Sequence, residues 1–223
     1  MSAAAERGHG HHPPYLAHHF HNMTQQADSN KMGMWLFLVQ EILFFAGLFM
    51  AYTCMRYLYP DTWLAAAEEL DKVMGAVNTV VLLTSSLTMA LGVRAAQLGN
   101  NRAVAGWCAL TIVGAYGFML IKYQEYSHKL HVGLLPGKFF SFEGLEQSAT
   151  EAPQLFFSIY FMMTGVHGLH VVIGIGVIVW IMFKALGNSF TSENYAAVEN
   201  VGLYWHLVDL IWIFLFPLLY LVR

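Results

Sequence analysis

The sequence predicts an all-α, polytopic membrane protein built as a bundle of five transmembrane helices. Of its 223 residues, 57% are hydrophobic and only 11% are charged, roughly half the charged fraction of an ordinary soluble domain. The polar residues are gathered in short blocks between long apolar runs. Continuous apolar runs are typical of membrane helices, whereas lipid-exposed barrel strands alternate between apolar and polar residues.

Five apolar segments are long enough to cross a bilayer as helices, which takes about 20 residues. They lie at about residues 32–57, 73–96, 103–126, 153–184 and 197–222. Residues 1–30 form a polar tail, and residues 31–223 form the membrane domain. The tail holds His9, His11, His12, His18, His19 and His21. These histidines are either a metal-binding tract or part of a mobile polar segment, and the sequence leaves both interpretations open.

Charge gives a weak prediction of topology and excludes one class of partner. Five crossings place the two termini on opposite sides, and the short loop flanked by Arg94 and Arg102 favours an N-terminus inside. The net charge of −3 comes with no basic patch, so no nucleic acid is expected as a partner. Cys54 and Cys108 lie in separate apolar runs without CxxC spacing and are predicted to be buried, unpaired thiols.

Glu41 stands about nine residues into the first apolar segment, roughly 13 Å along a helix. A carboxyl group there is costly when charged and must be protonated, paired or hydrated. It is either a proton-handling or headgroup-contacting group, or a neutral acid hydrogen-bonded between helices. Ser85 and His206 lie at a similar depth in their segments. We therefore predict a polar layer in which Glu41 meets the second or the fifth apolar segment.

His167 and His170 lie three positions apart in the fourth apolar segment and share a helix face. Gly165 and Gly168 beside them predict close packing of a neighbouring helix. Two histidines that point the same way from one helix do not clamp one haem between them. One of them could still pair with His206 around a haem, which remains an alternative. A metal centre needs three or more converging ligands, so no metal site is predicted.

The remaining polar candidates have both structural and functional interpretations. His206 and Asp209 can hydrogen-bond on one helix face, either to orient a histidine ligand or as a self-satisfied pair. Glu125 can pair with Lys122 or Lys129 and is interpreted as a snorkelled cluster at the membrane interface. Trp35 suits an interfacial aromatic belt. The polar side chains of the second segment are predicted to hydrogen-bond between helices; they are Asn78, Thr79, Thr84, Ser85, Ser86 and Thr88.

Five stretches, in this order and spacing, resemble subunit III of the haem–copper terminal oxidases, and of cytochrome c oxidase in particular. They are WLFLVQEILFFAGLF with Glu41, VNTVVLLTSS, YQEYSH, FMMTGVHGLHVVIG and YWHLVDLIWIFLFPLLY. The resemblance runs from about residue 31 to the C-terminus and does not include the tail. Each stretch alone is a weak signal, whereas the ordered set is specific.

The resemblance implies a non-catalytic subunit that carries no haem or copper of its own. Its partners would be the catalytic subunit I, which holds haem and copper, then subunit II, small subunits or a larger supercomplex, and membrane lipids. The implied roles are stabilising the oxygen-reducing centre, supporting proton uptake on the inner side, and binding phospholipid. Glu41 resembles the family's buried carboxylate. The polar and lipid-contact candidates are Trp35, Ser85, Glu125, His167, His170, His206 and Asp209.

Larger members of that family have seven helices, and the two before the carboxylate helix help to form a lipid-filled cleft. The five-helix form looks bacterial, which implies the cytoplasmic membrane with the N-terminus inside and the C-terminus outside. Without those two helices the cleft is open, absent or closed by another chain. Alternatives within the family are a quinol oxidase subunit or a relative associated with nitric oxide reductase. Alternatives of other classes are a haem-binding electron-transfer protein and a proton channel built on Glu41.

Overall fold

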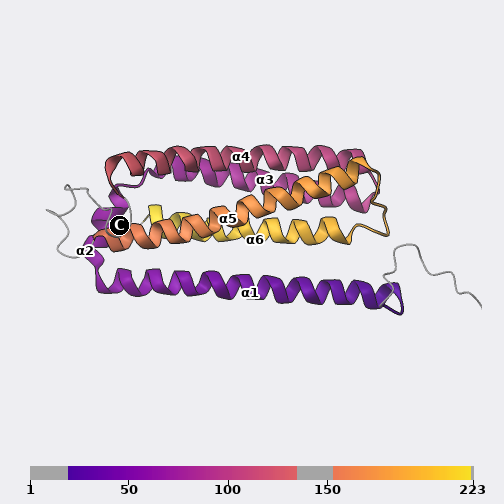
Figure 1. The fold of residues 1–223 in the computed structure, drawn as a ribbon, viewed down its shortest axis with the longest axis horizontal. Helices are drawn as coiled ribbons and strands as arrows, with labels where there is room; N and C mark the ends of the chain where they lie inside the picture. The colour runs from indigo at the N-terminus through magenta and orange to yellow at the C-terminus, as the bar shows by residue number, and fades with distance from the viewer. Residues whose placement is uncertain (1–19, 135–152, 222–223) are drawn as a thin grey trace, which may run out of the picture.

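The structure is a computed structural model that describes residues 20–134 and 153–221. In order, its helices are α1 (Met23–Leu58), α2 (Pro60–Glu68), α3 (Lys72–Gln97), α4 (Asn101–Val132), α5 (Pro153–Leu186) and α6 (Ala196–Tyr220). All of these except α2 are long and apolar enough to cross a membrane. The predicted all-α bundle of five membrane-crossing helices is therefore confirmed (Figure 1).

The helices begin and end at positions that local chemistry explains. α1 starts at Met23, before the predicted apolar start at residue 32, because the Asn22 side chain accepts a hydrogen bond from the Gln25 backbone N–H and caps the helix. Residues 23–30 of the predicted polar tail are thus helical, while residues 1–19 lie outside the described residues. α4 extends to Val132 and ends where Gly133 adopts a φ of 87°.

The short helix α2 was not among the predicted segments. Pro60 occupies its first turn, where a missing backbone N–H costs nothing and the fixed φ favours a helical start. Trp63 is fully buried and packs edge-on against Phe156 near the start of α5, with ring centroids 5.5 Å apart. α2 therefore closes the end of the bundle at which α1 finishes and α3 begins (Figure 1).

The centre of the bundle is formed by α3, α4, α5 and α6. α3 and α4 run antiparallel side by side, while α5 crosses obliquely in front of α6 (Figure 1). Glycines allow close approaches between these helices, as two examples show. A Cβ atom at Gly114 would lie 2.9 Å from the Ser85 side chain, and one at Gly174 would lie 2.8 Å from the Trp205 ring. The large side chains Trp205 and Trp212 are fully buried in this centre.

Gly165 and Gly168 do not pack against another helix. A Cβ atom at either position would meet no other atom within 4 Å. The prediction that these two glycines allow a neighbouring helix to come close is therefore wrong. They line a groove of about 380 Å³ between α4 and α5, which their missing side chains keep open.

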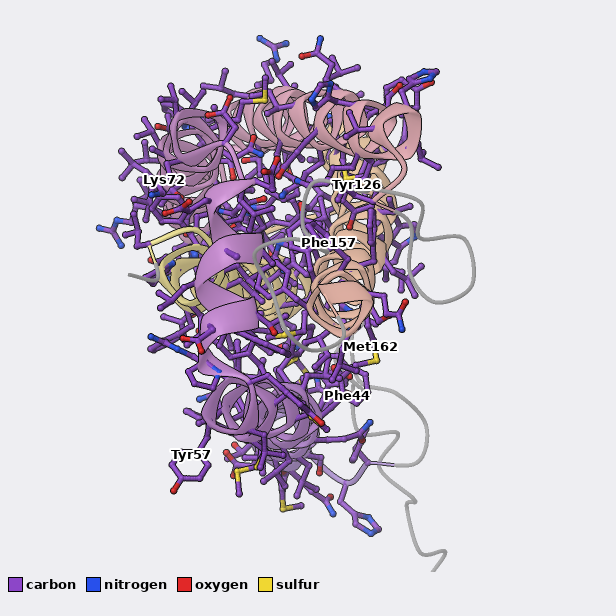
Figure 2. The ribbon with its side chains drawn as sticks, turned by 90° about the vertical axis from the view of Figure 1, so that its left-hand side faces the viewer. Phe44, Tyr57, Lys72, Tyr126, Phe157 and Met162 are labelled. Atoms are coloured by element: carbon purple, nitrogen blue, oxygen red, sulfur yellow. The ribbon has the colours of Figure 1, made fainter. Side chains whose placement is uncertain are left out.

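Helix α1 lies along the outside of this four-helix centre. Its buried residues are Leu38, Phe45 and Tyr52, which stand seven positions apart and so form one narrow stripe along the helix. The Tyr52 hydroxyl donates a hydrogen bond to the Leu218 carbonyl oxygen and ties α1 to the end of α6. Viewed along the bundle, Tyr57 points away from the other helices (Figure 2). α1 thus exposes most of its apolar surface.

Candidate functional site

The Glu41 carboxyl group on α1 contacts the imidazole ring of His170 on α5. Glu41 Oε2 lies 3.1 Å from His170 Nε2 on α5, and the two side chains are only 13% and 15% exposed. Phe45 packs edge-on against the same imidazole, with ring centroids 5.2 Å apart. The Tyr204 hydroxyl of α6 donates to the His170 carbonyl oxygen at 2.9 Å. Three helices therefore enclose the Glu41–His170 pair.

The other nitrogen of His170 determines which proton arrangements the pair can adopt. His170 Nδ1 lies 2.8 Å from the Val166 carbonyl oxygen. A carbonyl oxygen only accepts hydrogen bonds, so Nδ1 must carry a proton. Nε2 then either accepts a hydrogen bond from a protonated Glu41 or, as part of an imidazolium, donates one to the carboxylate. The two arrangements differ by the position of one proton between Glu41 and His170.

Within the predicted polar layer, Glu41 and His206 form hydrogen bonds with residues other than those expected. The prediction that Glu41 meets the second or fifth apolar segment is wrong for the direct contact, because its hydrogen-bond partner lies on α5, the fourth of the membrane-crossing helices. His206 instead pairs with α3, where Ser86 Oγ lies 2.6 Å from His206 Nδ1. The layer is therefore divided into one pair between α1 and α5 and a second between α3 and α6.

His167 and His170 turn toward different helices although they are three residues apart. The His167 ring is fully buried between Phe118 of α4 and Trp212 of α6, with ring centroids 5.6 and 5.3 Å away. Neither of its ring nitrogens has a hydrogen-bond partner among the described residues. The expectation that both histidines face the same way is thus wrong, because a three-residue step rotates the side chain by about 60°. His167 serves as a packed ring, and His170 as the partner of Glu41.

The seam between α3 and α6 contains most of the hydrogen bonds predicted for the second apolar segment. Trp205 Nε1 donates to Ser85 Oγ at 3.1 Å, and Trp212 Nε1 donates to Thr79 Oγ1 at 3.1 Å. Thr88 pairs with Thr111 of α4 at 2.8 Å. These side chains confirm the interhelical prediction. Two residues depart from it. The Thr84 hydroxyl donates to the Val80 carbonyl oxygen of its own helix, and neither polar atom of the buried Asn78 side chain has a hydrogen-bond partner among the described residues.

The predicted hydrogen bond between His206 and Asp209 does not form. His206 Nδ1 is directed to Ser86, and neither carboxylate oxygen of the buried Asp209 has a hydrogen-bond partner among the described residues. Ser86 lies close enough to Asp209 to interact with it electrostatically, although the contact falls outside ordinary hydrogen-bond geometry. Although the two residues are three positions apart on α6, His206 bonds to α3 across the helix interface.

Glu125 is the centre of a buried ion cluster at the end of the bundle closed by α2. Lys122 Nζ donates to its Oε2 at 2.8 Å, and Lys129 Nζ donates to its Oε1 at 2.6 Å. Tyr160 of α5 and Tyr220 of α6 donate their hydroxyls to Oε1 at 2.9 and 2.6 Å. All three charged side chains are under 10% exposed. These side chains are buried among helices, so the prediction that they snorkel toward water is wrong.

The sequence predicted the two lysine pairings but missed the tyrosines. Tyr160 and Tyr220 come from segments far from Glu125 in the chain, and the only available signal was that each is a polar-tipped aromatic residue near a helix end. Two ammonium groups share one carboxylate here. Lys122 Nζ also lies 4.5 Å above the Trp212 ring, which stabilises the surplus cation.

Trp35 and the two cysteines are the remaining sequence candidates. Trp35 on α1 is 65% exposed and faces away from the other helices. Cys108 is buried as predicted, whereas Cys54 is exposed on α1, so the expectation of a buried thiol fails there. In residues 20–134 and 153–221, no three histidine, cysteine, aspartate or glutamate side chains come together in a way that could hold a metal ion.

Comparison with known proteins points to one family. The family model for cytochrome c oxidase subunit III matches residues 14–222. A probable cytochrome c oxidase subunit 3 of Nocardia farcinica is 32% identical over 192 residues, which cover 86% of this chain and 87% of the relative. Cytochrome c oxidase subunit 3 of Synechocystis sp. is 32% identical over 206 residues, covering 92% and 78%. The same subunit of Corynebacterium diphtheriae is 31% identical over 194 residues, covering 86% and 87%.

Proposed function

Because the chain belongs to the cytochrome c oxidase subunit III family, we propose that it is the non-catalytic membrane subunit of a proton-pumping cytochrome c oxidase. Membership of this family makes it one chain of an oxidase complex. In that complex it packs against subunit I, which holds the haem and copper, in the company of subunit II. It stabilises the oxygen-reducing centre and carries no redox group itself.

The Glu41–His170 pair is the observation that carries the proposed role in proton uptake. It is enclosed by α1, α5 and α6, and it has two arrangements that differ by one proton. An ionised carboxyl group at this depth in a membrane is costly, because it loses its hydration. A neighbouring imidazole reduces that cost by sharing the charge. The pair therefore suits a group that takes up and releases protons beside the catalytic subunit.

Phospholipid binding is supported by the grooves beside α1. One groove of about 220 Å³ lies between α1 and α6, and another of about 260 Å³ lies among α1, α5 and α6. Both are walled almost entirely by apolar side chains, including Phe49, Phe214 and Val177. Acyl chains filling these grooves would hold the outlying helix against the centre of the bundle.

The proposed setting is the bacterial cytoplasmic membrane. The three relatives come from bacteria, and the five apolar helices make this a multi-pass membrane protein. We place the N-terminus inside and the C-terminus outside, in line with the arginines that flank the loop between α3 and α4. Glu41 then lies in the inner half of the membrane, from which protons are taken up.

The test is Glu41→Gln in the complete oxidase complex. Glutamine keeps the shape of the side chain and a hydrogen-bonding group, so we expect the complex to assemble with the same chains. The amide does not exchange a proton with His170, so we expect slower proton uptake and slower oxygen consumption with cytochrome c as the donor. The exposed Glu68 on α2 supplies the matched control, Glu68→Gln, which should behave like the unaltered protein.

Four results would contradict the proposal. Loss of this chain from the purified complex would mean that Glu41 acts in assembly, and unchanged proton uptake would mean that it has no part in proton transfer. A stoichiometric Soret band in the isolated chain would mean that it binds haem itself. Oxidation of quinol in place of cytochrome c would assign the chain to a quinol oxidase.

A further inference from the structure

A cavity of about 280 Å³ joins the Glu125 cluster to the outside of the bundle at the end closed by α2. This is the end that faces the viewer in Figure 2. The cavity wall contains two buried members of the cluster, Glu125 and Lys129. It also contains Glu69, Gln124 and His128, which are exposed. The cavity therefore leads from exposed polar side chains to two buried charged groups.

The position of Lys129 along α4 places this cavity at the level of water and headgroups. α4 has 32 residues, so it is about 48 Å long, whereas the hydrocarbon core of a bilayer is about 30 Å thick. The apolar run of this helix ends at about residue 126, one turn before Lys129. Water rather than acyl chains therefore meets the exposed side of the cavity.

The Glu125 cluster has two ammonium groups for one carboxylate. Lys122 and Lys129 each lie within 3 Å of the same carboxylate, at 2.8 and 2.6 Å, so their charges repel each other. From α5 and α6, the hydroxyls of Tyr160 and Tyr220 face the cluster and donate to Glu125. They stabilise the carboxylate and add no negative charge. The cluster is therefore in charge balance only after one ammonium group has lost a proton.

The other titratable groups in the cavity wall do not take the place of Glu125. The Asp71 carboxylate accepts hydrogen bonds at 2.8 and 3.1 Å from two backbone N–H groups in the first turn of α3. Glu69 and His128 are exposed, and water screens charges at such positions. Among the described residues, none of these three side chains forms an ion pair with Lys129, whose partner is Glu125.

The two lysines differ in what lies on their open side. Lys129 lines the polar cavity. Lys122 instead lines the groove between α4 and α5, whose wall is mostly apolar, and its ammonium lies 4.5 Å above the Trp212 ring. A proton that leaves a lysine needs an acceptor. Water in the polar cavity is an acceptor for Lys129, whereas acyl chains beside the apolar groove are not one for Lys122.

We propose that Lys129 exchanges a proton with water through this cavity, which makes the Glu125 cluster a proton-exchanging site at the α2 end of the bundle. An N–H bond of the ammonium breaks, water takes the proton as hydronium, and the nitrogen keeps the electron pair as a neutral amine. Lys122 and Glu125 remain as a balanced ion pair. The site is separate from the Glu41–His170 pair, and the proposed topology puts it on the outer side of the membrane.

The test measures how fast each lysine of the complete oxidase complex, held in lipid nanodiscs, is methylated by formaldehyde and cyanoborohydride over a range of pH. Only a neutral amine reacts, so labelling requires both loss of the proton and contact with water. Mass spectrometry of peptides gives the rate at each lysine, with the exposed Lys31 as the reference. We expect labelling of Lys129 to rise with pH, and labelling of Lys122 to be at least about tenfold slower, because reaching it requires local opening of the helices.

Two variants separate access from charge. Val132→Phe adds bulk to the cavity wall and should slow the labelling of Lys129, whereas the matched control Leu130→Phe changes an exposed residue outside the wall and should not. Lys122→Met removes the repelling ammonium and should slow the labelling of Lys129 at the same pH.

Three results would overturn the inference. Labelling of Lys129 that is no faster than that of Lys122 would mean that the cavity gives no access to a neutral amine. Equal rates in Val132→Phe and Leu130→Phe would rule out this cavity as the route. An unchanged or faster rate in Lys122→Met would show that the second ammonium does not drive the loss of the proton. None of these results bears on the role proposed for Glu41.

Discussion

The Glu125 cluster allows a quantitative prediction, because its two kinds of charge are present in unequal number. Glu125→Gln preserves the size of the side chain but removes the carboxylate that forms ion pairs with both Lys122 and Lys129. Among the described residues, both buried ammonium groups then lose their ion-pair partner. Removing one partner of a buried ion pair typically costs about 3–5 kcal/mol. The side chains are under 10% exposed, so solvent screens this loss little.

Lys129→Met should cost less than Glu125→Gln, although it removes the shorter of the two ion-pair contacts. Methionine fills much of the volume of the lysine side chain, and Lys122 and Glu125 remain as a neutral pair at 2.8 Å. The Tyr160 and Tyr220 hydroxyls still donate to Glu125. We expect a loss below about 2 kcal/mol, close to that of one hydrogen bond to a charged group.

The assay is thermal unfolding of the purified chain in detergent, followed by circular dichroism. For a chain of this length, 1 kcal/mol corresponds to a change of about 2–4 °C in Tm. Glu125→Gln should therefore lower Tm by roughly 6–20 °C, and Lys129→Met by less than about 8 °C. Glu68→Gln on the exposed face of α2 should leave Tm unchanged. A smaller fall in Tm for Glu125→Gln than for Lys129→Met would refute the reasoning that one carboxylate stabilises both ammonium groups.

Two further predictions concern packing. Gly174→Leu should lower the stability of the folded chain by about 1–3 kcal/mol, because its Cβ would lie 2.8 Å from the buried Trp205 ring. The same thermal assay should show no such loss for Gly106→Leu, where a Cβ meets nothing within 4 Å. Equal Tm values for the two variants would contradict the close approach of α5 and α6. In detergent, a maleimide should label the exposed Cys54 and leave Cys108 unmodified until the protein is unfolded in SDS. Labelling of both thiols in the folded protein, read by mass spectrometry, would show that α4 is not packed as described.

The five crossings were predictable because hydropathy responds to the bilayer and not to the neighbouring helices. Any segment of about 20 apolar residues satisfies its backbone as a helix in lipid. The same physics conceals which face of a helix is buried, since lipid and protein neighbours are equally apolar. The stripe of Leu38, Phe45 and Tyr52 that attaches α1 to the bundle does not stand out from the apolar residues around it.

The candidate site was predicted in its residues more than in its contacts. Glu41, His170 and His206 were selected because a polar group inside a membrane is costly and needs a partner. Spacing along one helix then suggested local partners, such as Asp209 for His206. The structure pairs His206 with Ser86 and Glu41 with His170, both across helices. Local spacing was sufficient only at Glu125, where both lysines do lie within hydrogen-bond distance on the same helix.

The sequence by itself determined that this protein crosses a membrane five times, which polar residues are held within the membrane, and which family it resembles. Those properties depend on composition and order along the chain. Only the tertiary structure decided that His167 and His170 face different helices, that Glu125 is buried beneath two tyrosines, and that Gly165 and Gly168 open a groove. These properties depend on the direction in which each helix crosses the bundle. The oblique path of α5 sets that direction, and no short stretch of sequence encodes it.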